Sequence, residues 1–263
     1  MLRLAYCQEV LPSRRRPSPY ATIVSTSSGV KELLFYPMEG SSKRVSILNE
    51  TLRIGVLALQ GDFREHIRAI ERLGASARPI RLSKDLADLD GVILPGGEST
   101  AIGKLMVTYG LVEPLRERIA AGMATWGTCA GLILLAKETD NALLGQPLLA
   151  TMDIRVRRNA FGTQRESFET ELAIPALGER PVHAVFIRAP LIESVGAGVE
   201  VLGRLEDAPG DGEANIVAAR QGHLLGTAFH PEVTDDLRFH SYFLNMARES
   251  RKGGRLEGRL TSV

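Results

Sequence analysis

The stretch Ala124-Thr125-Trp126-Gly127-Thr128-Cys129-Ala130-Gly131-Leu132 decides the fold, because it joins a strand to a helix through a cysteine. Residues 124–127 are predicted to form a short strand, and the apolar run 132–136 is predicted to be helical. Small residues two positions away on each side of Cys129 permit a sharp strand-to-helix turn, which projects a nucleophile from the carboxyl edge of a sheet. Taken alone, the stretch also fits a buried structural cysteine beside a tight turn.

Apolar runs and amphipathic segments alternate on both sides of this turn. Strands are predicted at 53–59 and 91–94, and helices at 63–73, 99–109 and 112–121. The later chain is richer in strands, predicted at 152–156, 182–187, 199–202, 216–219 and 224–229, and a last helix is predicted at 235–248. The pattern indicates an α/β fold: one three-layer domain over residues 53–248, with a mostly parallel central sheet flanked by helices.

Charge is distributed unevenly along the 263 residues. Residues 1–52 hold seven Lys or Arg and four Asp or Glu, residues 249–263 hold four and two, and residues 53–248 hold 21 and 25. We expect a disordered N-terminal extension (1–52), for which a targeting or accessory segment is the alternative, and a basic C-terminal tail (249–263). A mildly acidic domain does not indicate nucleic-acid binding. With no apolar run of about 18 residues and only two cysteines, the sequence predicts no membrane association and a cytoplasmic location.

A candidate base for the cysteine lies in Phe229-His230-Pro231-Glu232. His230 follows a predicted strand and is therefore expected at the same carboxyl edge as Cys129. Glu232 can return to the imidazole and fix its tautomer, which completes an arrangement of nucleophile, base and orienting group. A surface loop histidine is the alternative for His230 alone. The occurrence of both Cys129 and His230 favours catalysis.

The segment Pro95-Gly96-Gly97-Glu98-Ser99-Thr100 ends another predicted strand. Its glycines allow close approach of the backbone to a ligand, so the N–H of Gly97, together with that of Ala130, is a candidate donor to an oxyanion. A phosphate-binding loop is excluded because no Gly-Lys-Ser/Thr follows at the required spacing. Ser99 is also a candidate cap for the helix that begins there.

These motifs resemble those of the triad-type (class I) glutamine amidotransferases, a flavodoxin-like family, and most closely those of glutaminase subunits of pyridoxal 5'-phosphate synthase. The resemblance covers about residues 53–248. It rests on Leu59-Gln60-Gly61 with Glu65-His66, on the three segments above, on the motif from Arg158 to Gly162, and on the motif from Phe186 to Pro190. Ala130 and Ile133 stand where other triad glutaminases commonly have Leu and Gln, which favours the vitamin B6 pathway. Ala160 replaces a serine common in the family.

The resemblance implies that Cys129, His230 and Glu232 form a catalytic triad that hydrolyses L-glutamine to L-glutamate and ammonia through a thioester. It also implies glutamine contacts from Gly97, Glu98, Ser99, Arg158, Ile187 and Arg188. It further implies a synthase partner, a TIM-barrel subunit in a ring-shaped assembly that receives the ammonia, and an isolated glutaminase that is weakly active or silent. The physical counterpart is an induced fit, in which docking completes the oxyanion loop at Gly96 and Gly97. A glutaminase of another pathway and a non-catalytic regulatory protein remain the alternatives.

The other histidines carry less information. His66 is expected either to face the partner or to lie solvated on its helix. His183, His223 and His240 have no Cys, Asp or Glu at metal-ligand spacing, so neither a metal nor a cofactor is expected.

Overall fold

The computed structural model describes residues 21–25, 31–35, 51–140, 145–161, 167–206 and 215–260, and the chain divides into two units, residues 1–50 and 51–263. In the first unit, β1 (Ala21–Ser25) pairs antiparallel with β2 (Lys31–Phe35). These two strands were not predicted, because the segment shows no sustained alternation of apolar and polar residues. The sequence predicts disorder for residues 1–52. Apart from β1, β2, Thr51 and Leu52, these residues lie outside the part of the chain that the structure describes.

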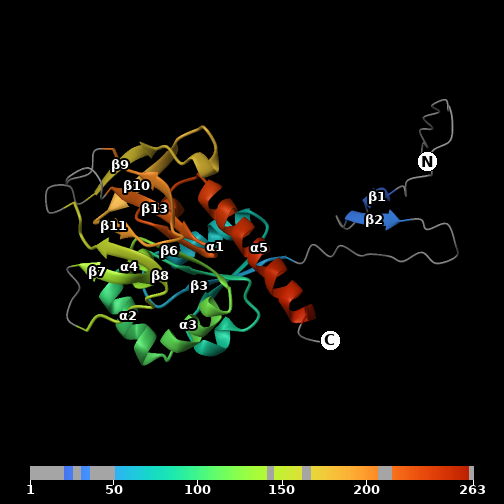
Figure 1. Cartoon of the computed structure of the whole chain (residues 1–263), viewed down its shortest axis with the longest axis horizontal. Helices are drawn as coiled ribbons and strands as arrows, with labels where there is room; N and C mark the ends of the chain where they lie inside the picture. The colour runs from blue at the N-terminus through green and yellow to red at the C-terminus, as the bar shows by residue number, and fades with distance from the viewer. Residues whose placement is uncertain are drawn as a thin grey trace. The chain divides into compact units, whose positions relative to one another are not determined.

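The second unit is built on a ten-stranded sheet, in the order β4-β3-β5-β6-β14-β13-β11-β8-β7 with β12 paired to β13 (Figure 1). Its strands are β3 (Arg53–Leu57), β4 (Ser76–Ile80), β5 (Gly91–Leu94), β6 (Ala124–Thr128), β7 (Ala136–Asp140), β8 (Met152–Arg157), β11 (Leu191–Val195), β12 (Glu200–Arg204), β13 (Ile216–Gln221) and β14 (Leu224–Thr227). The five strands from β4 to β14 are mutually parallel, so their carboxyl ends meet at one edge. A separate antiparallel pair consists of β9 (Ser167–Leu172) and β10 (Val182–Ile187).

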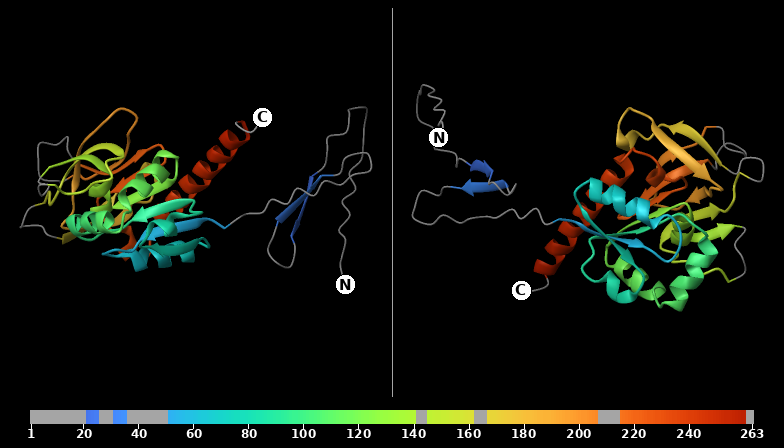
Figure 2. Two further views of the ribbon diagram at one scale, coloured as in Figure 1. Left: turned by 90° about the horizontal axis from the view of Figure 1, so that it is seen from below. Right: turned by 180° about the vertical axis from the view of Figure 1, so that it is seen from behind.

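Helices cover both faces of the sheet. They are α1 (Phe63–Arg72), α2 (Ser99–Thr108), α3 (Val112–Ala120), α4 (Ala130–Leu135) and α5 (Arg238–Leu260), with 3-10 turns η1 (Ser83–Leu86), η2 (Pro175–Leu177) and η3 (Pro231–Val233). Helices α1 and α5 lie together on one face, and α2 and α4 lie on the other (Figure 2). The α/β class, with helices on both faces of a largely parallel sheet, is therefore confirmed.

The aromatic core of the domain lies where β6 meets α5. Trp126, Phe239 and Phe243 are buried, and the Trp126 ring contacts both phenylalanine rings. Trp126 also donates from Nε1 to Thr227 Oγ1 on β14, at 3.1 Å, so its polar group is satisfied inside the core. This packing holds the strand that precedes Cys129 against its neighbour and against α5.

Two sequence predictions of the fold need correction. The last helix begins at Arg238 rather than at 235 and continues to Leu260 rather than ending at 248. Four strands, β4, β7, β9 and β11, were not predicted, because polar and charged residues interrupt their apolar runs; β4, for example, is an edge strand with the sequence Ser-Ala-Arg-Pro-Ile.

Across the described residues, no helix combines the length and the apolar character that crossing a membrane requires.

Candidate active site

Cys129 occupies the turn between β6 and α4 with φ of +48°, an uncommon conformation for a residue with a side chain. Small neighbours are required here: a Cβ at Gly131 would overlap the carbonyl oxygen of Leu94, and one at Gly127 would overlap that of Gly131. The turn is held by a bond from the Cys129 N–H to the Thr227 carbonyl oxygen, at 2.8 Å. The structure therefore contains the sharp strand-to-helix turn that the sequence predicted.

His230 and Glu232 follow β14 at the same edge of the sheet. The Nδ1 atom of His230 lies 2.7 Å from Oε1 of Glu232, and both side chains are buried. The opposite nitrogen, Nε2, has no hydrogen-bond partner among the described residues. It is therefore available to the Cys129 thiol or to a substrate.

The electrostatics of His230 favour its charged form. Burial lowers its pKa, but interactions with Cys129 and Glu232 outweigh burial and raise the pKa of His230 to about 10. Burial raises the pKa of Glu232 above its usual value, although its interactions with His230 act in the opposite direction. The charged imidazole of His230 therefore lies beside Cys129, the candidate nucleophile.

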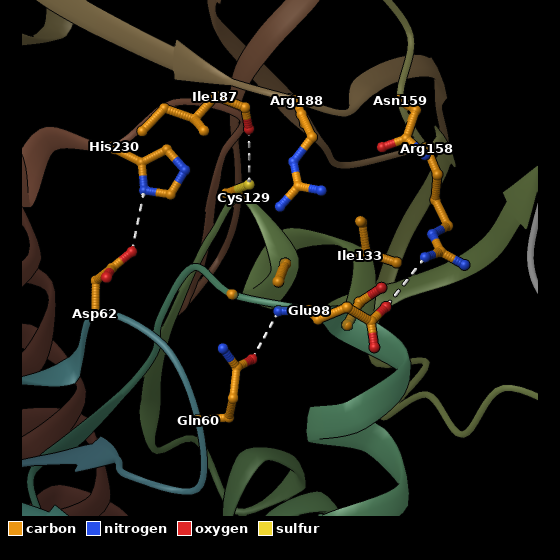
Figure 3. Close-up of a pocket in the computed structure, with 13 residues that line it drawn as sticks. Gln60, Asp62, Glu98, Cys129, Ile133, Arg158, Asn159, Ile187, Arg188 and His230 are labelled. Carbon is orange, nitrogen blue, oxygen red and sulfur yellow. Dashed lines mark hydrogen bonds and ion pairs between the residues drawn. The ribbon is translucent and has the colours of Figure 1, made fainter. Parts of the chain in front are cut away.

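A pocket of about 280 Å³ opens in front of Cys129 and His230 (Figure 3). Its volume is close to the lower end of the range for small-molecule sites. The lining includes every residue that the sequence analysis proposed for an oxyanion or for glutamine: Gly97, Glu98, Ser99, Ala130, Arg158, Ile187 and Arg188. Glu232 lies outside this lining, behind His230, as an orienting residue must.

Glu98, rather than Ser99, caps α2. Its two carboxylate oxygens accept the backbone N–H groups of Thr100 and Ala101, at 3.0 and 2.6 Å. Burial raises the pKa of Glu98, but these backbone bonds and the charge of Arg158 hold it below the usual value. Glu98 is thus an anion at neutral pH, suited to an ammonium group.

Arg158 contacts Glu98 and a residue that the sequence analysis did not single out. Its Nη2 lies 3.3 Å from Glu98 Oε1, and its Nη1 donates to Gln146 Oε1 at 2.8 Å. Gln146 in turn donates to Ser99 Oγ at 3.1 Å. The amide of Gln146 therefore links the guanidinium to the start of α2. Gln146 follows a segment without helical or strand period, so no sequence pattern indicated its role.

The loop at Gly96 and Gly97 is braced by the connection between β3 and α1. The side-chain oxygen of Gln60 accepts the N–H of Glu98 at 2.7 Å (Figure 3). The Asp62 N–H donates to the Gly96 carbonyl oxygen at 3.3 Å. Gly97 has φ of +150°, and a Cβ there would crowd the Gln60 amide. Gln60 therefore sets the position of the loop that carries a candidate oxyanion donor.

Backbone strain is concentrated at the pocket. Within the described residues, five that are not glycine have positive φ, and three of them, Cys129, Asn159 and Arg188, line it. Such conformations cost roughly 1–3 kcal/mol each and persist where surrounding structure holds them. Asn159 was not among the predicted contacts, although it belongs to the motif that begins at Arg158.

One expectation about the histidines is wrong, and a second histidine makes contacts that the sequence did not indicate. His66 is fully buried rather than solvated, and it bonds His240 and Thr128 behind the site. His183 lies 2.9 Å from both Glu169 and Glu171 across the β9–β10 pair, although both are more than ten residues away in sequence. Helix packing buries His66, and strand pairing brings Glu169 and Glu171 to His183. Neither arrangement follows from spacing along the chain.

Among the described residues, one group of three could hold a metal by distance: Asp62, His230 and Glu232. Within it, His230 Nδ1 already bonds Glu232 at 2.7 Å, and Asp62 Oδ2 lies 3.9 Å from the same nitrogen. We interpret this group as an acid–base pair with a neighbouring carboxylate.

Comparisons with known proteins agree with this geometry. Residues 56–249 match the profile of the SNO glutamine amidotransferase family. A pyridoxal 5'-phosphate synthase subunit PdxT of Herpetosiphon aurantiacus is 55% identical over 196 residues, which are 74% of this chain and 100% of that protein. The corresponding subunit of Carboxydothermus hydrogenoformans is 54% identical over 193 residues, 73% of this chain and 96% of that protein.

Two solved structures align with this chain. A crystal structure of a glutamine amidotransferase aligns with a TM-score of 0.67 at 49% identity, covering 74% of this chain and 98% of that one. The structure of PurLQS from Thermotoga maritima, at 16% identity and a TM-score of 0.55, covers 74% of this chain and 98% of that one and shares the fold.

Proposed function

Because the chain belongs to the SNO glutamine amidotransferase family, we propose that Cys129, His230 and Glu232 are the triad with which it hydrolyses glutamine. The enzyme is the glutaminase subunit of a pyridoxal 5'-phosphate synthase and works with a synthase partner subunit. One observation carries the assignment of the triad: His230 is held by a buried carboxylate on one nitrogen, while the other faces a pocket that contains Cys129.

The reaction follows from these groups. The Cys129 thiolate attacks the side-chain amide carbon of glutamine, and the N–H groups of Gly97 and Ala130 stabilise the oxyanion. The C–N bond then breaks as His230 gives its proton to the departing ammonia, which leaves a thioester on Cys129. A water molecule, deprotonated by His230, attacks the thioester, and glutamate is released. Glutamine and water are thus converted to glutamate and ammonia, and Cys129 and His230 return to their starting forms.

The pocket also supports the choice of glutamine. An α-amino acid presents an ammonium and a carboxylate side by side, and the pocket offers Glu98 for the first and Arg158 and Arg188 for the second. Ser99 and Ile187 complete the predicted contacts. In the absence of substrate, Arg158 and Glu98 compensate each other's charge at 3.3 Å.

We propose that the partner is a TIM-barrel subunit in a ring-shaped assembly, and that docking adjusts the loop at Gly96 and Gly97. The bond between Gln60 and the Glu98 N–H supports this, because it joins the loop to an exposed residue, Gln60, that a partner can reach. Docking is then expected to raise kcat more than it lowers KM. A cytoplasmic location is part of the proposal, since a nucleophilic thiol needs a reducing environment.

The test is a coupled assay of pyridoxal 5'-phosphate formation with the synthase partner, using either glutamine or an ammonium salt as nitrogen source. Cys129→Ala is expected to abolish glutamine-dependent synthesis and to leave ammonium-dependent synthesis intact. Cys7→Ala makes the same change at the other cysteine and should leave both activities unchanged. Glutamine-dependent synthesis by Cys129→Ala would falsify the triad assignment, and failure of every chain with this partner would point to a glutaminase of another pathway.

A further inference from the structure

Two histidines lie buried behind the triad, and the proposed mechanism uses neither. His66 comes from α1 and His240 from α5, and both side chains are fully buried. They meet on the face of the sheet where α1 and α5 pack together, next to the ring of Trp126. Burying an imidazole requires partners for its nitrogens, so the contacts of this pair indicate what it does.

The contacts continue the hydrogen-bonded line of the triad. Beyond the 2.7 Å bond from His230 to Glu232 Oε1, the other carboxylate oxygen, Oε2, faces His66 Nε2 at 3.4 Å. The same nitrogen lies 3.2 Å from Thr128 Oγ1, and His66 Nδ1 lies 3.0 Å from His240 Nε2. Glu232 Oε2 has no hydrogen bond of ordinary geometry within the described part of the chain. His66 Nε2 is therefore the nitrogen placed to donate to it.

The surroundings of His240 Nδ1 indicate which ring nitrogens of His66 and His240 carry the hydrogens. Burial, with the charges of His240 and His230, holds the pKa of His66 well below its usual range, and burial lowers that of His240 to about 4, so both rings are neutral. His240 Nδ1 is buried and has no hydrogen-bond partner among the residues that the structure describes. A buried N–H without an acceptor is rarer and costlier than a bare nitrogen, so the hydrogen of His240 belongs on Nε2. His240 then donates to His66 Nδ1, which leaves the hydrogen of His66 on Nε2, directed at Thr128 and Glu232.

We propose that His66 is a positioning residue for the glutaminase reaction: its Nε2–H supports the second oxygen of Glu232, and His240 fixes the tautomer in which it does so. The inference rests on the proposed triad. A buried carboxylate that accepts from His230 on one oxygen and His66 on the other stays ionised and cannot rotate away. His230 therefore keeps the orientation and charge that Cys129 needs.

The surroundings of Glu232 make such a donor necessary. On the side of α1, Asp62 adds a negative charge near His230 and raises the pKa of Glu232 further. A cavity of about 280 Å³ that borders Glu232 is lined by charged residues that form two surface ion pairs, Glu65 with Arg68 and Arg72 with Asp235. The cations of these pairs are compensated by their own partners and exposed, so they give Glu232 little support.

The test compares two replacements of similar size at His66 in the complex with the synthase partner. His66→Met fills the space without a donor, whereas His66→Gln retains an amide N–H. Losing a hydrogen bond to a buried charge raises the pKa of that carboxyl by about one unit. The acidic limb of kcat/KM against pH is therefore expected to move up by about one unit in His66→Met and by less than half of that in His66→Gln. Thermal unfolding of both variants checks that they are folded.

His240→Met provides an independent measurement. Because His240 acts through His66, its replacement should shift the acidic limb in the same direction, and the shift should vanish when His66 is already Met. An unshifted limb in His66→Met, equal shifts in the Met and Gln variants, or additive effects of His66 and His240 would each overturn the inference. The proposed function is tested independently of His66: it is wrong if Cys129→Ala retains glutamine-dependent activity.

Discussion

Gly96→Ala tests how closely the loop after β5 is fitted to the imidazole of His230. Gly96 does not have positive φ, so its backbone accepts an alanine. The added Cβ, however, would lie 2.9 Å from His230 Nδ1 and still closer to Cε1. The substitution therefore acts through one contact, between a methyl group and the proposed base.

The size of the effect follows from that contact. Carbon atoms pack at about 3.5–4.0 Å, so the ring has to move by roughly 1 Å. It has little freedom, because Glu232 holds Nδ1 at 2.7 Å and the His230 N–H bonds the Val185 carbonyl oxygen at 2.9 Å. A misplacement of about 1 Å at a catalytic group costs on the order of 100-fold in rate, or about 2.7 kcal/mol of transition-state stabilisation. Crowding is expected to lower the free energy of unfolding by a further ~1–3 kcal/mol.

The assay is glutaminase kcat at saturating glutamine in the presence of the synthase partner, with thermal unfolding recorded in parallel. We expect kcat to fall about 100-fold while KM changes much less, since His230 acts on the reacting amide. Gly253→Ala is the matched control, because a Cβ there meets no atom of the described part of the chain within 4 Å. A folded Gly96→Ala protein with the kcat of the wild type would refute the argument that this loop fixes the ring.

Two further predictions concern residues around the site and on the β9–β10 pair. Gln146→Leu removes the acceptor for Arg158 Nη1 and should raise the KM for glutamine about tenfold with little change in kcat, as steady-state kinetics will show; a change confined to kcat would contradict this. For His183, bonds to Glu171 and then Glu169 raise the folded pKa above 6.5, so the charged ring stabilises the fold below that pH and the stabilisation is lost as pH rises through the folded pKa. The melting temperature of His183→Gln should therefore lie below that of the wild type at pH 6 and match it at pH 9, whereas a constant difference would exclude the charge effect.

The part of the fold that local patterns determine could be predicted from the sequence. Strands β3 and β5 are largely apolar and buried on both faces, β6 is a short buried strand before the turn at Cys129, and α1 carries its apolar residues at helical spacing, so each was recognised within a few residues. Polar strands were missed, because what stabilises β4 is pairing with β3 rather than the burial of its own side chains. The start of α5 was placed three residues too early: the helix begins at Arg238, whose N–H donates to the side chain of Asp236 just before it.

Residues of the candidate site also fall into those that local sequence patterns predict and those that only tertiary packing brings to the site. Cys129, His230 and the loop at Gly96 and Gly97 follow strands directly, and parallel strands bring their ends together whatever the rest of the chain does. Gln146 and His66 reach the site from segments whose position depends on tertiary packing, and no spacing along the sequence connects them to Cys129. The cap on α2 was assigned to Ser99 because serine is a common capping residue, yet Glu98 reaches both N–H groups with one carboxylate.

Different parts of the fold set different properties of the proposed triad. The position of Cys129 depends on contacts within the sheet, where Gly127 and Gly131 allow the turn and Thr227 holds its N–H. The charge of Glu232 depends on the face of the sheet that α1 and α5 cover, where α1 supplies His66 and α5 supplies His240. Substitutions at the turn should therefore lower the rate at every pH, whereas substitutions at the junction of α1 and α5 should change how the rate depends on pH. This separation exists because the nucleophile is placed by backbone geometry and the base is tuned by buried side chains.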